Sequence, residues 1–140
     1  MYCTLNDILD MMDEAEIIRY TDDDDTGAVN TAVTDKAITG AGALIESHLA
    51  VRYTVPVSPA PDIVRELAVD IAIYKIQSRR GQSPEEIRKK YEDAIKYLEK
   101  VASGKIILPG ASAAPTGIGS DAVTITTSTR IFSRESMKGY

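Results

Sequence analysis

The chain holds very little of the chemistry that small enzymes and metal proteins use. Its 140 residues include one cysteine, one histidine, one phenylalanine and no tryptophan. A single cysteine excludes a disulfide within the chain and fits a reducing compartment. The sequence also lacks a glycine-rich phosphate loop, an H-E-x-x-H pattern and a C-x-x-C pair. We therefore expect no catalytic activity and no cofactor.

Long apolar runs are missing as well. No stretch approaches the roughly 18 apolar residues of a membrane-spanning helix, and no basic-then-apolar segment opens the chain. We expect neither a membrane span nor a signal peptide. The length is that of one domain, long enough to bury a core.

The charges that are present are distributed unevenly. Residues 1–35 hold ten acids against Arg19 alone, for a net charge of −9. Residues 36–104 hold nine acids and eleven bases, and residues 105–140 hold two acids and four bases, so each segment carries +2. Opposite charges at different places on one chain can attract neighbouring copies. No segment is basic enough for tight, salt-dependent DNA binding.

Apolar residues at helical spacing predict a mainly α fold, a small bundle of four to five helices. We expect a short helix from Thr4, a further turn at 13–18, and long helices near 31–53, 62–80 and 84–103. The second long helix should be buried on most sides. Its apolar face consists of Ile63, Val64, Leu67, Ala68, Ile71, Ala72 and Ile76.

Helix starts carry capping signals. The Thr4 hydroxyl can accept a hydrogen bond from a free backbone N–H, and Asp7 adds negative charge at the positive helix end. Asn30 or Thr31 is placed to cap the first long helix.

The last helix and the glycines of the first long one carry further signals. Ser83 and Glu86 match the S-x-x-E pattern, which predicts a capping box with Pro84 at the first helical position. Gly40 and Gly42 lie inside a predicted helix, which indicates close approach of another backbone.

The end of the chain predicts an extended arm. Residues 105–109 suit a short strand or a strap over the core, and residues 110–120 have a flexible-linker composition. Residues 122–129 alternate apolar side chains with threonine, as a strand does. We place a helical domain at 1–109 and a linker with a partly β C-terminal arm at 110–140.

The arm carries apolar groups that a solvated tail would not need, among them the only phenylalanine. These groups have no core of their own within reach, so we expect the arm to bind another protein. The predicted interaction residues are Arg130, Ile131, Phe132, Arg134, Met137 and Tyr140.

The nearest approach to a metal site is the acidic run Asp22, Asp23, Asp24 and Asp25. An EF-hand loop counted from the first of these would have its glycine at position six, but position twelve is Val33 where the loop needs glutamate. The pattern favours a solvated acidic loop over a Ca²⁺ site.

The basic residues Arg79 and Arg80, with Arg88, Lys89 and Lys90, form a modest patch around one corner. We interpret it as a solvated face, with contact to DNA phosphate or an acidic partner as the alternative. Both the acidic run and the two arginines remain candidates for charged contacts between proteins.

Several segments together resemble a family of small Mu-like phage and prophage proteins encoded in the head-to-tail joining region. The resemblance covers almost the whole chain. The segments that carry it are 2–7 (YCTLND), 45–53 (IESHLAVRY) with Pro56, 61–67 (PDIVREL), 71–80 (IAIYKIQSRR), 91–98 (YEDAIKYL) and 130–140 (RIFSRESMKGY).

The resemblance implies a structural head-tail connector, a head-completion adaptor that forms a ring beneath the portal. It implies a homo-oligomer, expected to be a dodecamer, with the portal protein and a tail-side completion or terminator protein as partners. Genomic DNA would pass through the ring without tight binding. The protein would reside at the head-tail interface of the virion and in the host cytoplasm during assembly.

The alternative function is a small DNA- or protein-binding regulatory module. Helices 62–80 and 84–103 superficially suggest a helix-turn-helix. The second of them carries Glu85, Glu86, Glu92 and Asp93, which would repel phosphate.

Overall fold

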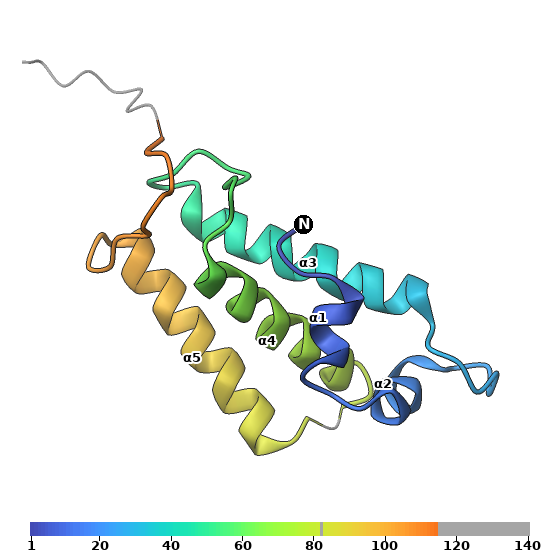
Figure 1. Cartoon of the computed structure of the whole chain (residues 1–140). Coiled ribbons are helices and arrows are strands. Elements are labelled where there is room, and N and C mark those ends of the chain that lie inside the picture. Colours follow the sequence, from blue (N-terminus) through green and yellow to red (C-terminus); the bar gives the residue numbers. More distant parts are fainter. Residues whose placement is uncertain (82, 115–140) are drawn as a thin grey trace, which may run out of the picture.

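The computed structural model describes residues 1–81 and 83–114 as a bundle of helices (Figure 1). The elements are α1 Leu5–Leu9, α2 Glu14–Thr21, α3 Thr31–Leu49, α4 Asp62–Ser78 and α5 Glu85–Ala102. The predicted mainly α class is confirmed. In the described part of the chain, the β structure is one isolated antiparallel bridge between Tyr53 and Ala113.

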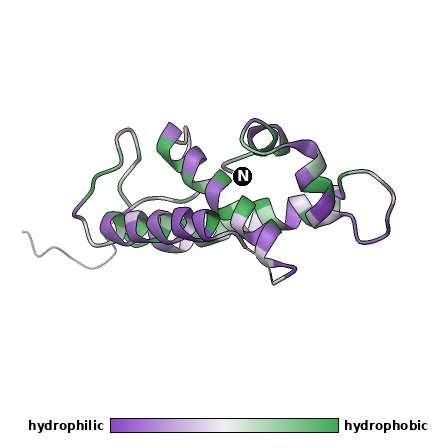
Figure 2. Ribbon diagram, turned by 90° about the horizontal axis from the view of Figure 1, so that it is seen from below, coloured by the Kyte–Doolittle hydropathy of each residue, from purple (hydrophilic) through white to green (hydrophobic). Residues whose placement is uncertain are grey.

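Helix α4 is the centre of the bundle, because it packs against each of the other four helices. The long helices α3, α4 and α5 also pack against one another, while α1 and α2 lie across one side (Figure 1). Figure 2 shows the apolar residues turned inward between the helices. Ile71 and Ala72 of α4 are fully buried, which confirms the prediction that this helix is covered on most sides.

The Thr4 and Asn30 caps form as the sequence indicates. The Thr4 hydroxyl accepts from the Asp7 N–H at 3.4 Å, and the Asp7 carboxylate accepts from the Thr4 N–H at 2.7 Å. Together these bonds make a reciprocal capping box at α1. The side chain of Asn30 accepts from the Val33 N–H at 3.3 Å and caps α3.

The capping box predicted at Ser83 is wrong. Helix α5 begins one residue later than predicted, with Pro84 as N-cap at ψ 145° and no side-chain capping bond. The Ser83 hydroxyl instead lies 3.5 Å from the Pro84 carbonyl oxygen. Because the extended backbone at Pro84 separates the serine from the first helical turn, its hydroxyl does not bond the free N–H groups there.

Replacing the two predicted capping residues by alanine should therefore have unequal effects. We expect Thr4→Ala to lower the free energy of unfolding by about 1 kcal/mol, the usual cost of a lost N-cap hydroxyl. Ser83→Ala should change it by much less. Urea unfolding of both variants tests this, and an equal loss in both would contradict the assignment of the caps.

The glycines of α3 make room for side chains. A Cβ at Gly40 would meet the Lys75 side chain at 3.5 Å, and one at Gly42 would meet the Tyr2 ring at 3.8 Å. The prediction that another backbone approaches these two glycines closely is wrong. Long side chains from α4 and the N-terminus occupy that space instead.

The hydroxyl groups of two buried tyrosines hold loops against one end of the bundle by hydrogen bonds. The Tyr2 hydroxyl accepts from the Val57 N–H, and the Tyr53 hydroxyl accepts from the Leu108 N–H, each at 3.0 Å. Residues 105–109 form no strand, so the strap alternative describes them, with Leu108 buried over the core.

The described chain beyond the predicted boundary at 109 also contacts the bundle. The Thr54 N–H donates to the Ser112 carbonyl at 3.0 Å, and the Ala114 N–H donates to the Arg52 carbonyl at 2.8 Å. Part of the predicted linker therefore lies against the loop after α3. The boundary at 109 itself stays a prediction, and the predicted strand at 122–129 lies outside the described residues.

Removing the Tyr53 hydroxyl should destabilise the fold. In Tyr53→Phe the Leu108 N–H would be left buried without an acceptor, which costs roughly 1–3 kcal/mol of unfolding free energy. The melting temperature of Tyr53→Phe measures this loss, with Tyr97→Phe as the control variant. Within the described part of the chain, no hydrogen bond of the Tyr97 hydroxyl is found, unlike that of Tyr53. Equal melting temperatures for the two variants would contradict this role.

Candidate interaction surfaces

The described residues offer no obvious catalytic or metal centre. Within 1–81 and 83–114, no group of three or more His, Cys, Asp or Glu side chains is placed to hold a metal ion. Among the same residues, no helix is long and apolar enough to cross a membrane. Cys3 is buried, and burial raises the pKa of its thiol to about 11, so the thiol is protonated at neutral pH.

Ion pairs and hydrogen bonds hold the acidic loop after α2 against the end of α4. Asp23 forms ion pairs with Arg79 and with Arg80, the latter at 3.0 Å. Arg80 also donates to the Asp22 carbonyl at 2.8 Å, and Arg79 donates to the Tyr20 carbonyl at 3.3 Å. The structure thus brings together two sets of predicted charged-contact residues, within one chain.

The carboxylate of Asp22 organises the loop itself. It accepts from the N–H groups of Thr26 at 3.0 Å and Gly27 at 2.7 Å, and these bonds hold its pKa below the ordinary range. The two arginines likewise lower the pKa of Asp23. Asp24 and Asp25 are exposed, as predicted for a solvated acidic loop.

The basic patch has most of its charges paired within the chain. Besides the two arginines bound to Asp23, Arg88 pairs with Glu92 at 2.8 Å and Lys89 with Glu85 at 2.9 Å. These pairs are exposed and individually weak. They nevertheless place an acid beside four of the five bases, Lys90 being the exception among these pairs, which supports the interpretation as a solvated face.

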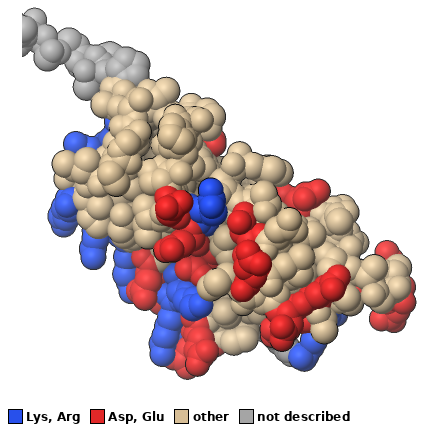
Figure 3. Space-filling model, viewed as in Figure 1, with Lys and Arg blue, Asp and Glu red and all other residues tan. Residues whose placement is uncertain are grey.

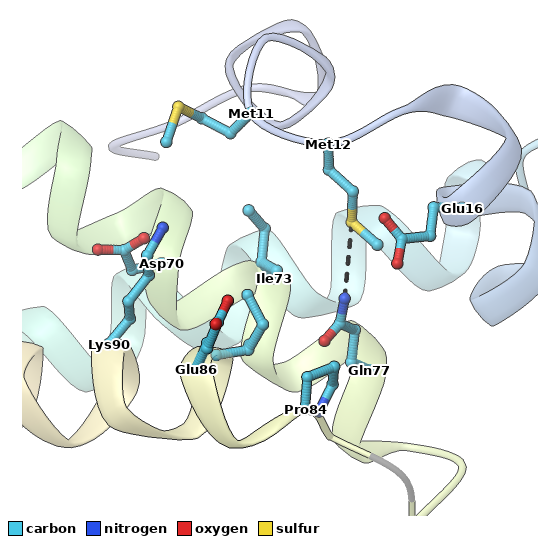
Figure 4. A pocket seen from close by; sticks show the side chains of 10 residues that line it. Met11, Met12, Glu16, Asp70, Ile73, Gln77, Pro84, Glu86 and Lys90 are labelled. Atoms are coloured by element: carbon cyan, nitrogen blue, oxygen red, sulfur yellow. Dashed lines mark hydrogen bonds between the residues drawn. The ribbon is translucent and has the colours of Figure 1, made fainter.

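A hollow of about 210 Å³, the first hollow, opens where the segment joining α1 to α2 meets α4 and α5. Figure 4 shows its side chains. It is lined by Met11, Met12, Glu16, Asp70, Ile73, Gln77, Pro84, Glu86, Ile87 and Lys90. Apolar groups thus lie among three carboxylates and a single lysine.

The second hollow, of about 330 Å³, adjoins the first and shares Met11, Asp70 and Lys90 with it. Its other lining residues are Asp7, Asp10, Arg65, Glu66 and Val69. We call the two hollows together the acidic groove, since they contain six acids and two bases. Figure 3 shows acidic and basic side chains interspersed over the face formed by α1, α4 and α5, with many of the basic ones along α5.

Two polar groups of α4, the buried Gln77 and the half-buried Asp70, distinguish the acidic groove from an ordinary surface depression. Gln77 is 2% exposed; its amide nitrogen lies 4.0 Å from the Met12 sulfur, and its amide oxygen has no hydrogen-bond partner (Figure 4). Burial raises the pKa of Asp70, and Lys90 only partly opposes this. Both groups cost stability in the isolated chain.

Sequence reasoning missed the acidic groove. Its residues come from α1, α2, α4 and α5, so no motif contains them. The available signal was Asp70 and Gln77, two polar residues inside the central, largely buried helix α4.

We expect Asp70→Asn to stabilise the protein at neutral pH. The folded state holds the Asp70 proton more tightly than the unfolded chain, so stability falls as pH rises from the ordinary carboxyl pKa to the raised one. The asparagine side chain does not ionise, so the variant avoids this loss of stability. Its advantage should vanish below pH 4, where both states are protonated.

Unfolding midpoints of wild type and Asp70→Asn across pH 3–8 test this, with the exposed Asp24→Asn as control. A midpoint for Asp70→Asn that is lower than wild type at pH 7 would contradict the expectation.

The fold defines the class of small helical-bundle proteins. In the described part of the chain, its distinguishing features are candidate surfaces for contact with other proteins. Comparison with known proteins is more specific. The family model for Bacteriophage Mu, Gp36 matches residues 2–126, and the chain belongs to this family. The predicted membership of a Mu-like phage family is confirmed.

Two relatives show the range of similarity. The chain is 29% identical over 116 residues to "Gene product J" of Escherichia phage Mu, which covers 81% of this chain and 79% of that protein. It is 35% identical over 81 residues to "Mu-like prophage FluMu protein gp36" of Haemophilus influenzae. That match covers 58% of this chain and just over half, 56%, of the Haemophilus protein.

Proposed function

We propose that this phage-family protein is a structural head-tail connector. In this proposal, copies form a ring beneath the portal, expected to be dodecameric, and DNA passes through it. The observation that carries the proposal is the match to the Mu family over residues 2–126. The resemblance of its segments, in their order, to proteins of the head-to-tail joining region supports the specific role.

The charge distribution supports a ring. A ring needs a heterologous interface, in which one surface of each copy meets a different surface of the next. The acidic groove lies on the bundle, whereas residues 105–140 carry a net charge of +2. The chain thus carries an acidic groove and a segment of opposite net charge, which could meet between copies.

A conduit for DNA should not retain it. Residues Arg79, Arg80, Arg88 and Lys89 are each paired with an acid within the chain, which reduces what they can offer to phosphate. We propose that the protein is not an enzyme and that its partners are the portal and a tail-side completion or terminator protein. The protein would then be located in the virion, and in the host cytoplasm while the particle assembles.

Native mass spectrometry of the purified chain, alone and with the portal protein, tests the proposal. We expect a closed ring of identical copies that joins the portal. A chain that stays monomeric in both samples would contradict it. A gel shift at low salt separates the rival: a regulatory module would form a discrete complex with DNA, and a connector would not.

A further inference from the structure

We propose that the acidic groove of one copy binds the Arg130-x-Phe132-x-Arg134 segment of the neighbouring copy. This inference rests on the proposed ring and names its interface. The occupant is inferred from charge and from the unsatisfied group in the groove.

The groove suits basic side chains with apolar stems. Its six acids outnumber Arg65 and Lys90, so the pair of hollows carries a net charge of −4. The Gln77 amide oxygen in the first hollow lacks a hydrogen-bond donor. A guanidinium carries five N–H donors on an aliphatic stem, so it can serve the carboxylates and this oxygen together.

Met11 supplies the apolar contact. Its side chain is 61% exposed and lines both hollows, so it lies where they adjoin. Methionine sulfur and methyl groups pack well against aromatic rings. A phenylalanine seated on Met11 would cover this exposed group and exclude water from the neighbouring charges.

The arm has the matching order of groups. In an extended segment, side chains two residues apart point to the same side. The groove would then face three side chains at once, those of Arg130, Phe132 and Arg134. One arginine would lie over each hollow, and the phenyl ring of Phe132 would lie on Met11. Ile131 and Ser133 would face away.

The groove and the last described residue of the chain lie near opposite ends of α5. The first hollow is lined by Pro84, Glu86 and Ile87, at the start of α5. Ala114 pairs with Arg52, near the other end of α5, roughly 27 Å away for an 18-residue helix. Figure 1 shows this separation along the bundle. Residues 115–129 could extend to about 50 Å, so the choice of a neighbouring copy rests on the proposed ring. Head-to-tail contacts of this kind close into a ring when the rotation between copies allows it.

Charge reversal in the full-length chain tests the pairing. The groove variant carries Glu66→Lys and Glu86→Lys, one exposed acid from each hollow; the arm variant carries Arg130→Glu and Arg134→Glu. Control variants are Asp93→Lys on the outer face of α5 and Lys138→Glu elsewhere in the arm. Sedimentation velocity over a concentration series measures self-association, and thermal unfolding checks that each variant folds.

We expect the groove and arm variants to lose self-association when each is alone, whereas the controls keep it. A mixture of the two should assemble from alternating copies, because the unchanged arm meets the unchanged groove and the reversed arm meets the reversed groove. A chain with both sets of reversals should assemble again. Assembly of the chain with both sets of reversals, but not of the mixture, would mean that the arm binds its own groove, which overturns the proposal.

The outcomes also separate this inference from the proposed function. If wild type and every folded variant assemble alike, the ring stands and the groove-arm contact is wrong. If wild type remains monomeric at all concentrations but joins a ring on the portal, groove and arm do not join copies by themselves, and the inference is wrong again. If it forms no ring with the portal either, the proposed function fails.

Discussion

Ile71→Asp should prevent folding. The Ile71 side chain lies in the middle of α4, is 0% exposed, and belongs to the helix that contacts every other helix. An unpaired carboxylate there costs at least several kcal/mol. Because small domains are stable by only about 5–15 kcal/mol, this loss removes most or all of the margin.

Circular dichroism and a thermal scan measure the effect, and Ile107→Asp is the matched control. Ile107 is 76% exposed, so the same substitution buries no charge there and should leave the melting transition nearly unchanged. A cooperative transition at the wild-type temperature in Ile71→Asp would mean that α4 is not the core helix.

The second large effect concerns the arm, whose residues lie outside the described part of the chain. We expect Phe132→Ala combined with Arg134→Ala to abolish ring formation or joining to the tail, because it removes the apolar anchor and one of its charges. Monomer stability should be unchanged. Ser133→Ala combined with Lys138→Ala removes none of the proposed anchors and should leave both assembly and monomer stability unchanged.

Hydrogen exchange gives an independent view of the same event. Residues 121–140 should exchange more slowly in the assembled particle than in the monomer. Equal protection in both states, or a loss of monomer stability in the double variant, would show that the arm belongs to its own bundle and would contradict its role in assembly.

Local features of the fold were predictable, and the reason is visible at α1. The bonds between Thr4 and Asp7 span three residues, so the sequence contains the whole motif. The buried faces of α3 and α4 follow from helical spacing in the same way. The Ser83 box failed although it is local, because the backbone at Pro84 stays extended and moves the helix start.

Contacts distant in sequence were not predictable. The bond of Tyr53 to Leu108 spans 55 residues, and Asp23 is more than 50 residues from each of its arginine partners. The acidic groove likewise exists only because the connection after α1 is folded onto α4 and α5. A surface assembled from four helices leaves no pattern in any one segment.

The central claim is that this protein joins heads to tails. Electron microscopy of particles from a phage that encodes this chain, with and without its gene, tests that claim most directly. We predict that loss of the gene leaves DNA-filled heads and complete tails that are not joined, and that wild-type protein supplied in trans restores joined particles. Joined, infectious particles in the absence of the protein would contradict the claim.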